Sequence, residues 1–246
     1  MIPCSAKLPI IALFTSFFFE KNNAIIATSF YFLSIGLIIL SSFVLKMFSK
    51  KSNGQLYIFE MPEYRLPKLK FLYQDVKIKI IEFIKKAGTV IFLASLLSWF
   101  LLSFSTSLEY GVDINESIMA FCGKKVAWLF YPILGTNSWE ASVSAIQGLI
   151  AKEQVVSSMK IIAGLSENLL NMDKTFQGNG PFGFFTPASA YAFVAFNLFT
   201  TPCIAAIASM FKEIKNGKRF IFAILYQFLI GWIVAASLFH ILICWE

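Results

Sequence analysis

Charged residues are scarce in this chain. Only 14% of its 246 residues are Asp, Glu, Lys or Arg, whereas 57% are hydrophobic and 28 are Phe. Soluble domains carry about 25% charged residues. Four stretches contain no charged residue: Ala24–Leu45, Ala87–Leu108, Pro187–Phe211 and Phe220–Trp245. A membrane-spanning helix needs about 20 apolar residues, and a buried helix of a soluble domain is usually shorter than about 15, so each run is predicted to cross a membrane.

Several motifs of enzymes and metal sites are also absent. The chain contains no GxxxxGK[ST], GxSxG or HExxH sequence, so nothing in it indicates NTP hydrolysis or another enzymatic activity. Its four cysteines, Cys4, Cys122, Cys203 and Cys244, show no CxxC spacing, which argues against a zinc site or a disulfide framework. The N-terminus lacks the basic region and the small-residue cleavage site of a signal peptide.

Positive charge is concentrated beside the ends of hydrophobic runs. Ten of the 21 Lys and Arg lie in residues 46–86, against four acidic residues, and four more lie in residues 212–219, against one. This is the positive-inside pattern, so both loops are predicted to be cytoplasmic, and nucleic acid is not expected as a partner. From Leu69 to Lys86 apolar residues recur at spacings of three and four, which predicts a basic amphipathic helix. It either lies on the inner membrane surface or is a solvated juxtamembrane helix.

The segment between Leu108 and Pro187 must start and finish outside if both basic loops are inside. Val126–Leu134 is apolar but short, and Ala141–Ala151 and Gln154–Leu165 are too short or too polar for ordinary spans. Re-entrant elements or a pair of short crossings would fit. Irregular backbone at membrane depth is tolerated only when it is buried in protein or lines a wet cavity, so these segments indicate a transport site.

A proline followed directly by a cysteine occurs twice, at Pro3-Cys4 and at Pro202-Cys203. Proline interrupts a helix and frees a backbone carbonyl. A thiol is a soft ligand that suits a late first-row metal such as Fe(II). The hydroxyls of Thr200 and Thr201 could add oxygen ligands at the second element. The alternative is that each cysteine packs as a small hydrophobic residue.

Glu153 is a further candidate ligand, because carboxylates inside a membrane are costly and are usually functional. Lys152 beside it is interpreted as a salt-bridge partner or an interface anchor, and an ordinary interfacial ion pair is the alternative to a functional site. Glu140, next to Trp139, is expected at a membrane interface. His240 is the single histidine and has no carboxylate near it in the sequence, so packing or an interface position is favoured over a metal site.

Five segments, in the same order along the chain, resemble FeoB-type ferrous iron transporters. They are Pro3–Ile10 (PCSAKLPI), Glu60–Pro67 (EMPEYRLP), Phe83–Ile91 (FIKKAGTVI), Gly148–Glu153 (GLIAKE) and Tyr191–Ala205. The first resembles the family's Cys-[Ser/Gly]-Ala-[Arg/Lys]-Leu-Pro element, and the fourth resembles its Gly-x-x-Ala-Lys-Glu. The resemblance covers nearly the whole chain and identifies it as the C-terminal part of the family's membrane domain.

The hydrophobic runs and the resemblance together predict an all-α integral membrane protein. About four full transmembrane helices are expected, with short broken or re-entrant helices, as half of a two-gate repeat transporter. The expected parts are residues 1–45, the end of the central membrane region; residues 46–86, a cytoplasmic basic loop and amphipathic helix; residues 87–211, the second gate domain; and residues 212–246, a cytoplasmic turn and the last transmembrane helix.

The resemblance also implies a function, namely part of the Fe(II) permeation path of a ferrous iron importer in a bacterial inner membrane. Cys4 and Cys203 match positions proposed for iron handling in the family, and Glu153 matches its motif glutamate. Transient contact with Fe(II) is expected, with no stably bound cofactor. The family's GTP-binding domain, helical domain and first gate are not in this sequence, so the N-terminal half is an expected partner.

A FeoA-like small protein and further copies of the chain are additional candidate partners. The alternative function is a non-functional truncated remnant or a membrane scaffold, because Met1 falls where the family's sequence is already deep in the membrane domain. An upstream reading frame that encodes a GxxxxGK[ST] domain and the first gate would favour a split transporter over a remnant.

Overall fold

The computed structural model describes residues 3–19, 21–48, 68–86, 88–89, 92–105, 109, 114–150, 152, 154–162, 176, 180–214 and 216–245. Within these ranges the chain is almost entirely helical, and the only extended pairing is an isolated bridge between Ser105 and Ser117. The predicted all-α class of membrane protein is confirmed. Glu153 and the segment Glu60–Pro67 lie outside the described residues.

Two unbroken helices are long and apolar enough to cross a membrane: α2 (Asn23–Phe48) and α11 (Gly217–Ile243). A third candidate span is the pair α5 (Ile118–Leu134) and α6 (Trp139–Ile150), whose axes meet at 94°. The bend follows Gly135, whose left-handed backbone (φ 70°) ends α5. Bent elements of this kind were expected in this stretch of the chain.

Within the described residues, two or three elements are of spanning length, where the sequence predicted about four for the whole chain. The run that begins at Pro187 is divided into α9 (Pro187–Phe199) and α10 (Ile204–Glu213). The division falls at Pro202, which has no amide hydrogen with which to continue the helix. In the run that begins at Ala87, the described α-helix is α4 (Phe92–Ser103), which is too short to span alone.

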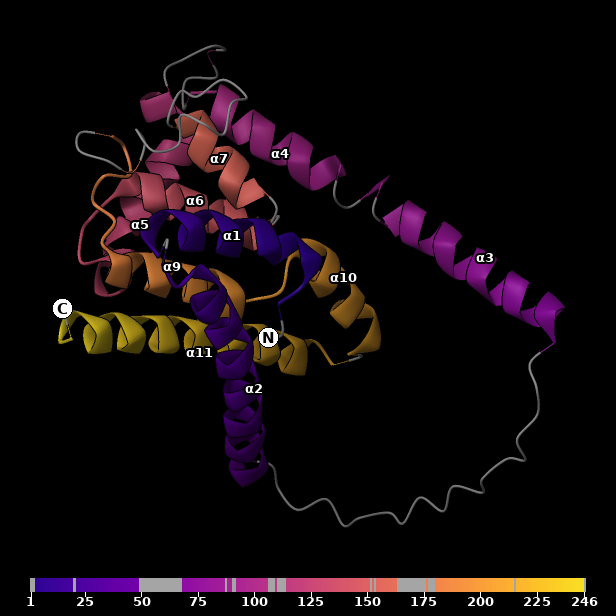
Figure 1. Cartoon of the computed structure of the whole chain (residues 1–246). Helices are drawn as coiled ribbons and strands as arrows, with labels where there is room; N and C mark the ends of the chain where they lie inside the picture. The colour runs from indigo at the N-terminus through magenta and orange to yellow at the C-terminus, as the bar shows by residue number, and fades with distance from the viewer. Residues whose placement is uncertain are drawn as a thin grey trace.

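Shorter helices complete the described part of the chain. They are η1 (Ser5–Lys7), α1 (Leu8–Phe18), α3 (Leu69–Lys86), η3 (Ile114–Glu116) and α7 (Gln154–Ile162). Helix α3 has the bounds predicted for the amphipathic helix, and with α4 it forms an arm that extends from the body (Figure 1). Its apolar residues Leu72, Val76 and Ile80 are exposed, so they are free to contact lipid. A position on the inner membrane surface stays a prediction.

Helix α9 is the centre of the fold. All its residues are buried except Pro187, which is exposed, and Tyr191, which is partly buried. It packs along α11 and contacts α1, α5 and α6 (Figure 1). Its start is fixed by a capping box, in which Thr186 and Ser189 each accept a hydrogen bond from the other's backbone N–H. A helix that is apolar on all sides is stable only when it is enclosed in this way.

Phenylalanine rings join α1 to α9. The Phe14 ring lies 5.5 Å from the Phe193 ring and 5.4 Å from the Phe185 ring, measured between centroids. The Phe18 ring, one turn further along α1, lies 6.4 Å from the Phe185 ring. These pairs make the two helices antiparallel, so that the start of α1 lies beside the end of α9. Aromatic pairs at such distances contribute about 0.5–1.5 kcal/mol each beyond their buried area.

Candidate functional site

The candidate site is the break between α9 and α10, at Thr200–Cys203. The last amide of α9's hydrogen-bond ladder is that of Thr200, which donates to the Phe196 carbonyl oxygen at 3.0 Å. Pro202 cannot donate to the Leu198 carbonyl, as a residue at that position would in a continuous helix. The carbonyls at the end of α9 therefore need other partners, because water is scarce in such an interior.

Two buried lysines supply those partners. The Lys152 amine donates to the Asn197 carbonyl oxygen at 2.6 Å, and the Lys7 amine donates to the Leu198 carbonyl oxygen at 2.7 Å. Lys152 is 5% exposed and Lys7 is 7% exposed. The C-terminal end of a helix carries partial negative charge, which favours cations there. Lys152, which the sequence suggested as an interface anchor or ion-pair partner, is a buried donor to a main-chain carbonyl.

Helix α11 closes on the same break from another side. The Gln227 side-chain amide donates to the Thr200 carbonyl oxygen at 3.4 Å. Gly231 lies one turn further along, where a Cβ atom would come within 2.6 Å of the Thr200 backbone nitrogen. Glycine is required for this approach, because a side chain there would meet backbone that cannot rotate away.

Gly148, in the last turn of α6, and Lys152, which follows α6, both contact Asn197. Gly148 approaches the Asn197 side chain so closely that a Cβ atom would overlap its oxygen. Lys152 then donates to the Asn197 main-chain carbonyl. The Asn197 side-chain amide donates to the Phe193 carbonyl at 2.9 Å, which fixes its orientation. The glycine and the lysine of the GLIAKE segment thus both hold the end of α9.

The two predicted cysteines belong to segments at this break. Cys4 directly precedes η1 and is exposed, and Cys203 directly precedes α10 and is partly buried. Both have extended backbone, and neither side chain caps its helix. The Lys7 backbone N–H donates to the Cys4 carbonyl oxygen at 2.9 Å, and the Lys7 amine donates to the Leu198 carbonyl oxygen, five residues before Cys203. The structure therefore brings together two Pro-Cys elements from opposite ends of the chain.

The remaining candidate ligands differ in whether the structure places them at the break. Thr200 and Thr201 are buried at the break, and the Thr200 hydroxyl donates to the Phe196 carbonyl at 2.6 Å. Glu153 lies outside the described residues. Among the residues that are described, no group of three or more His, Cys, Asp or Glu is placed to hold a metal ion. His240 is exposed on α11 and contacts the Phe239 ring.

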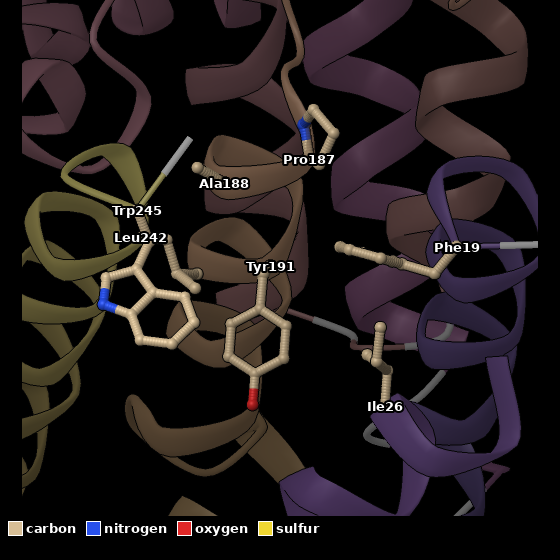
Figure 2. A pocket seen from close by; sticks show the side chains of 7 residues that line it. All are labelled: Phe19, Ile26, Pro187, Ala188, Tyr191, Leu242 and Trp245. Carbon is tan, nitrogen blue, oxygen red and sulfur yellow. The ribbon is translucent and has the colours of Figure 1, made fainter. Parts of the chain in front are cut away.

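A separate apolar cavity of about 340 Å³ lies toward the other end of α9. Its lining residues are Phe19, Ile26, Pro187, Ala188, Tyr191, Leu242 and Trp245 (Figure 2). Tyr191 projects between Phe19 and Ile26 on one side and Leu242 and Trp245 on the other (Figure 2), and its hydroxyl lies 2.9 Å from the Ser29 hydroxyl. None of the described residues that line this cavity supplies a thiol, carboxylate or imidazole, the side chains that suit Fe(II).

Lys7, Gln227 and Gly231 are residues of the site that sequence reasoning missed. Lys7 lies within the PCSAKLPI segment and Lys152 lies within GLIAKE, two of the five segments that resemble the family. That shared feature was the available signal for the lysines. Gln227 and Gly231 have no comparable signal, because a glutamine and a glycine are unremarkable within one long apolar run.

Comparison with known families identifies two matching regions. Residues 84–217 match the family model Gate, which is described as nucleoside recognition. Residues 27–79 match the family model for the C terminus of ferrous iron transport protein B. No solved structure matches the chain.

Several curated proteins match along nearly the whole chain. The chain is 35% identical over 243 residues to the Fe(2+) transporter FeoB of Staphylococcus aureus (strain MSSA476). The matched region covers 97% of this chain and 34% of that protein. It is 33% identical over 242 residues to the Fe(2+) transporter FeoB of Methanocaldococcus jannaschii, and the matched region covers 96% of this chain and 35% of the relative.

A third relative is a fused protein. The chain is 27% identical over 285 residues to the Fe(2+) transport protein A/Fe(2+) transporter FeoB fusion protein of Porphyromonas gingivalis. The matched region covers 98% of this chain and 33% of the relative. The chain thus spans about a third of the length of these relatives. Because it matches the Gate model over more than half its length and FeoB proteins over nearly all of it, the chain belongs to the FeoB family of ferrous iron transporters.

Proposed function

We propose that this chain forms part of the Fe(II) path of a ferrous iron importer, and that the ion passes the break between α9 and α10. The observation that carries the proposal is that Lys7, which follows Cys4 in η1, bonds to the end of α9 at the break that contains Cys203, so both Pro-Cys elements lie at the break. Membership of the family supports Fe(II) as the transported ion. The ion is a substrate in this proposal, and no stably bound cofactor takes part.

The ligands offered at the break suit conduction better than storage. Carbonyl oxygens, the Thr200 and Thr201 hydroxyls and two thiols form a mixed set, which binds an ion more weakly than a closed cage of thiolates and imidazoles. Conduction requires binding that is favourable yet weak and spread over several sites. Glu153, which follows Lys152 in the chain, would add a carboxylate on the same path.

The rest of the transporter supplies the energy in this proposal. A GTP-binding domain outside this sequence gates the path, since the chain contains no phosphate-binding loop motif. The chain lies in the bacterial inner membrane, with the loops at residues 46–86 and 212–219 in the cytoplasm. A FeoA-like protein is a candidate partner, because the Porphyromonas gingivalis relative joins the two proteins in one polypeptide. Self-association stays a prediction.

Cysteine substitution in the complete transporter tests the proposal. Cys203→Ser keeps the shape of the side chain and replaces sulfur by oxygen, so Fe(II) uptake should fall several-fold at an unchanged protein level. Cys4→Ser should also lower uptake, and the double variant should lose less than the product of the two effects if both thiols serve one site. Radioactive iron uptake is measured in cells that have no other ferrous transporter.

Cys122→Ser and Cys244→Ser are the matched controls, because both cysteines are free and exposed outside the break, Cys122 on α5 and Cys244 directly after α11. Neither control should change uptake. Normal uptake by the double variant of Cys4 and Cys203 would reduce both thiols to packing residues. The path would then have to run past Glu153 and main-chain oxygens alone.

A further inference from the structure

Lys7 and Lys152 place two amines on adjacent carbonyls at the end of α9, those of Leu198 and Asn197. We propose that these lysines are tethered cations that occupy the carbonyl site in a closed state, and that a permeating divalent cation must displace them. The inference rests on the proposed function. It adds a cation site, formed by the two carbonyl oxygens, and the two lysines that close that site. The two oxygens are then a cation site that lysine and metal ion share in turn.

The geometry favours a cation site over two unrelated helix caps. Both carbonyls lie at the partly negative end of α9, and Pro202 removes the amide that would otherwise bond to Leu198. Within the described part of the chain, neither lysine has a carboxylate partner. The carbonyl oxygens are therefore the acceptors that the described structure provides for two buried amines. Ammonium and Fe(II) both seek such oxygens, so they compete for the same position.

The position of each lysine in the chain links displacement to the candidate ligands. Lys7 comes from the short η1 helix that follows Cys4, and Lys152 directly precedes Glu153 in the sequence. A lysine leaves its carbonyl only if its side chain or its segment moves. Either movement takes a like charge away from the break, and a movement of the segment would also shift the neighbouring thiol or carboxylate. The lysines can thus couple access of the ion to rearrangement of its ligands.

An exposed lysine elsewhere provides the comparison for ordinary capping. The Lys124 amine donates to the Asn115 carbonyl oxygen at 2.9 Å, and Lys124 is exposed on α5. Its hydrogen bond has the same donor and acceptor groups as those of Lys7 and Lys152. Lys124 lies away from the break, however, and its exposed amine can bond to solvent instead of the carbonyl. Lys124 is therefore the matched control for each substitution.

Binding of Co(II), a redox-stable probe for Fe(II), tests the proposal on the full chain in lipid nanodiscs. Lys7→Gln and Lys152→Gln each keep a hydrogen-bond donor and remove the charge. Each should bind Co(II) about tenfold more tightly or better than the unaltered chain, because a like charge next to the ion has been removed. Lys7→Arg and Lys152→Arg keep the charge and should bind like the unaltered chain. Lys124→Gln should also leave the affinity unchanged.

A second measurement needs no substitution. Saturating Co(II) should release the two amines of the unaltered chain and raise the labelling of Lys7 and Lys152 by an amine-reactive reagent, read by mass spectrometry. Labelling of Lys124 should not change. Unchanged labelling of Lys7 and Lys152 with bound Co(II), or folded Gln variants with unchanged or weaker affinity, would show that the lysines only cap the helix.

The outcome for the lysines can be separated from the outcome for the thiols. If the Cys4 and Cys203 variants lose uptake while the Gln variants bind Co(II) like the unaltered chain, the thiol path stands and the tethered cations are refuted. If the Gln variants bind more tightly while the cysteine variants transport normally, the shared carbonyl site stands and the thiols are not ligands.

Discussion

Replacing Gly231 by alanine should push α11 away from the break that follows α9. A Cβ atom at this position would lie 2.6 Å from the Thr200 backbone nitrogen and 2.8 Å from the Phe199 carbonyl carbon. Both neighbours are backbone atoms, so neither can rotate aside. The added methyl group must be accommodated by a shift of the helix, which would also lengthen the Gln227–Thr200 hydrogen bond, already 3.4 Å.

The magnitude follows from two opposing contributions. Overpacking a dense interior costs about 1–3 kcal/mol, and contact with backbone places this site near the upper limit. Alanine returns about 1 kcal/mol because it is the better helix former. The net expectation is a loss of about 2 kcal/mol, which lowers the melting temperature of a chain of this size by roughly 4–8 °C.

Gly36 is the matched control for this prediction. It lies in the apolar helix α2, and a Cβ atom there would meet nothing within 4 Å. Gly36→Ala should therefore be neutral or stabilising by up to about 1 kcal/mol. Thermal unfolding of both variants, followed by intrinsic fluorescence in the same detergent, gives the comparison. If Gly231→Ala melts at or above the unaltered protein, α11 does not approach the break as closely as the structure indicates.

Two further predictions concern a buried hydrogen bond and the membrane topology. Trp232→Phe removes the 2.9 Å hydrogen bond from the indole N–H to the Leu129 carbonyl and should lower the stability by about 1 kcal/mol in the same melting assay. Trp245 is 91% exposed, so Trp245→Phe should change the stability little. Equal melting temperatures for the two variants would contradict this prediction. A membrane-impermeant thiol reagent added outside cells should label Asp113→Cys and spare Ser52→Cys, and the reverse result would overturn the predicted topology.

Periodicity predicted the helices well where it was regular. Helix α3 has the predicted bounds, α2 covers the whole run Ala24–Leu45, and α11 covers the run that begins at Phe220 except for its last two residues. The prediction was less complete for α5, which begins at Ile118 although its apolar run begins at Val126. Lys124 and Lys125 lie within the helix because their amines reach a carbonyl at the surface and the Phe121 ring. Long basic side chains can keep their charge at the surface while the backbone remains helical.

The break at Thr200–Cys203 was also predictable, because a proline within an apolar run interrupts the helix wherever the chain goes. The partners of its carbonyls could not be predicted. Lys7 and Leu198 are 191 positions apart, and Lys152 and Asn197 are 45 apart. Contacts over such separations depend on how the helices pack, which is a property of the fold and has no periodicity in the sequence.

The kinds of hydrogen-bond donor at the break are the strongest argument that the positive charge of the two lysines has a role there. The Thr200 carbonyl accepts from a neutral side-chain amide, that of Gln227. The neighbouring carbonyls of Leu198 and Asn197 accept from lysines. A neutral donor would satisfy those oxygens equally well, and burying an ammonium group costs far more than burying an amide. Two lysines side by side also repel each other when both are charged, so this pair is a more costly choice of donors than two neutral amides. Competition with a permeating cation is a use that the position of both lysines at a single helix end allows.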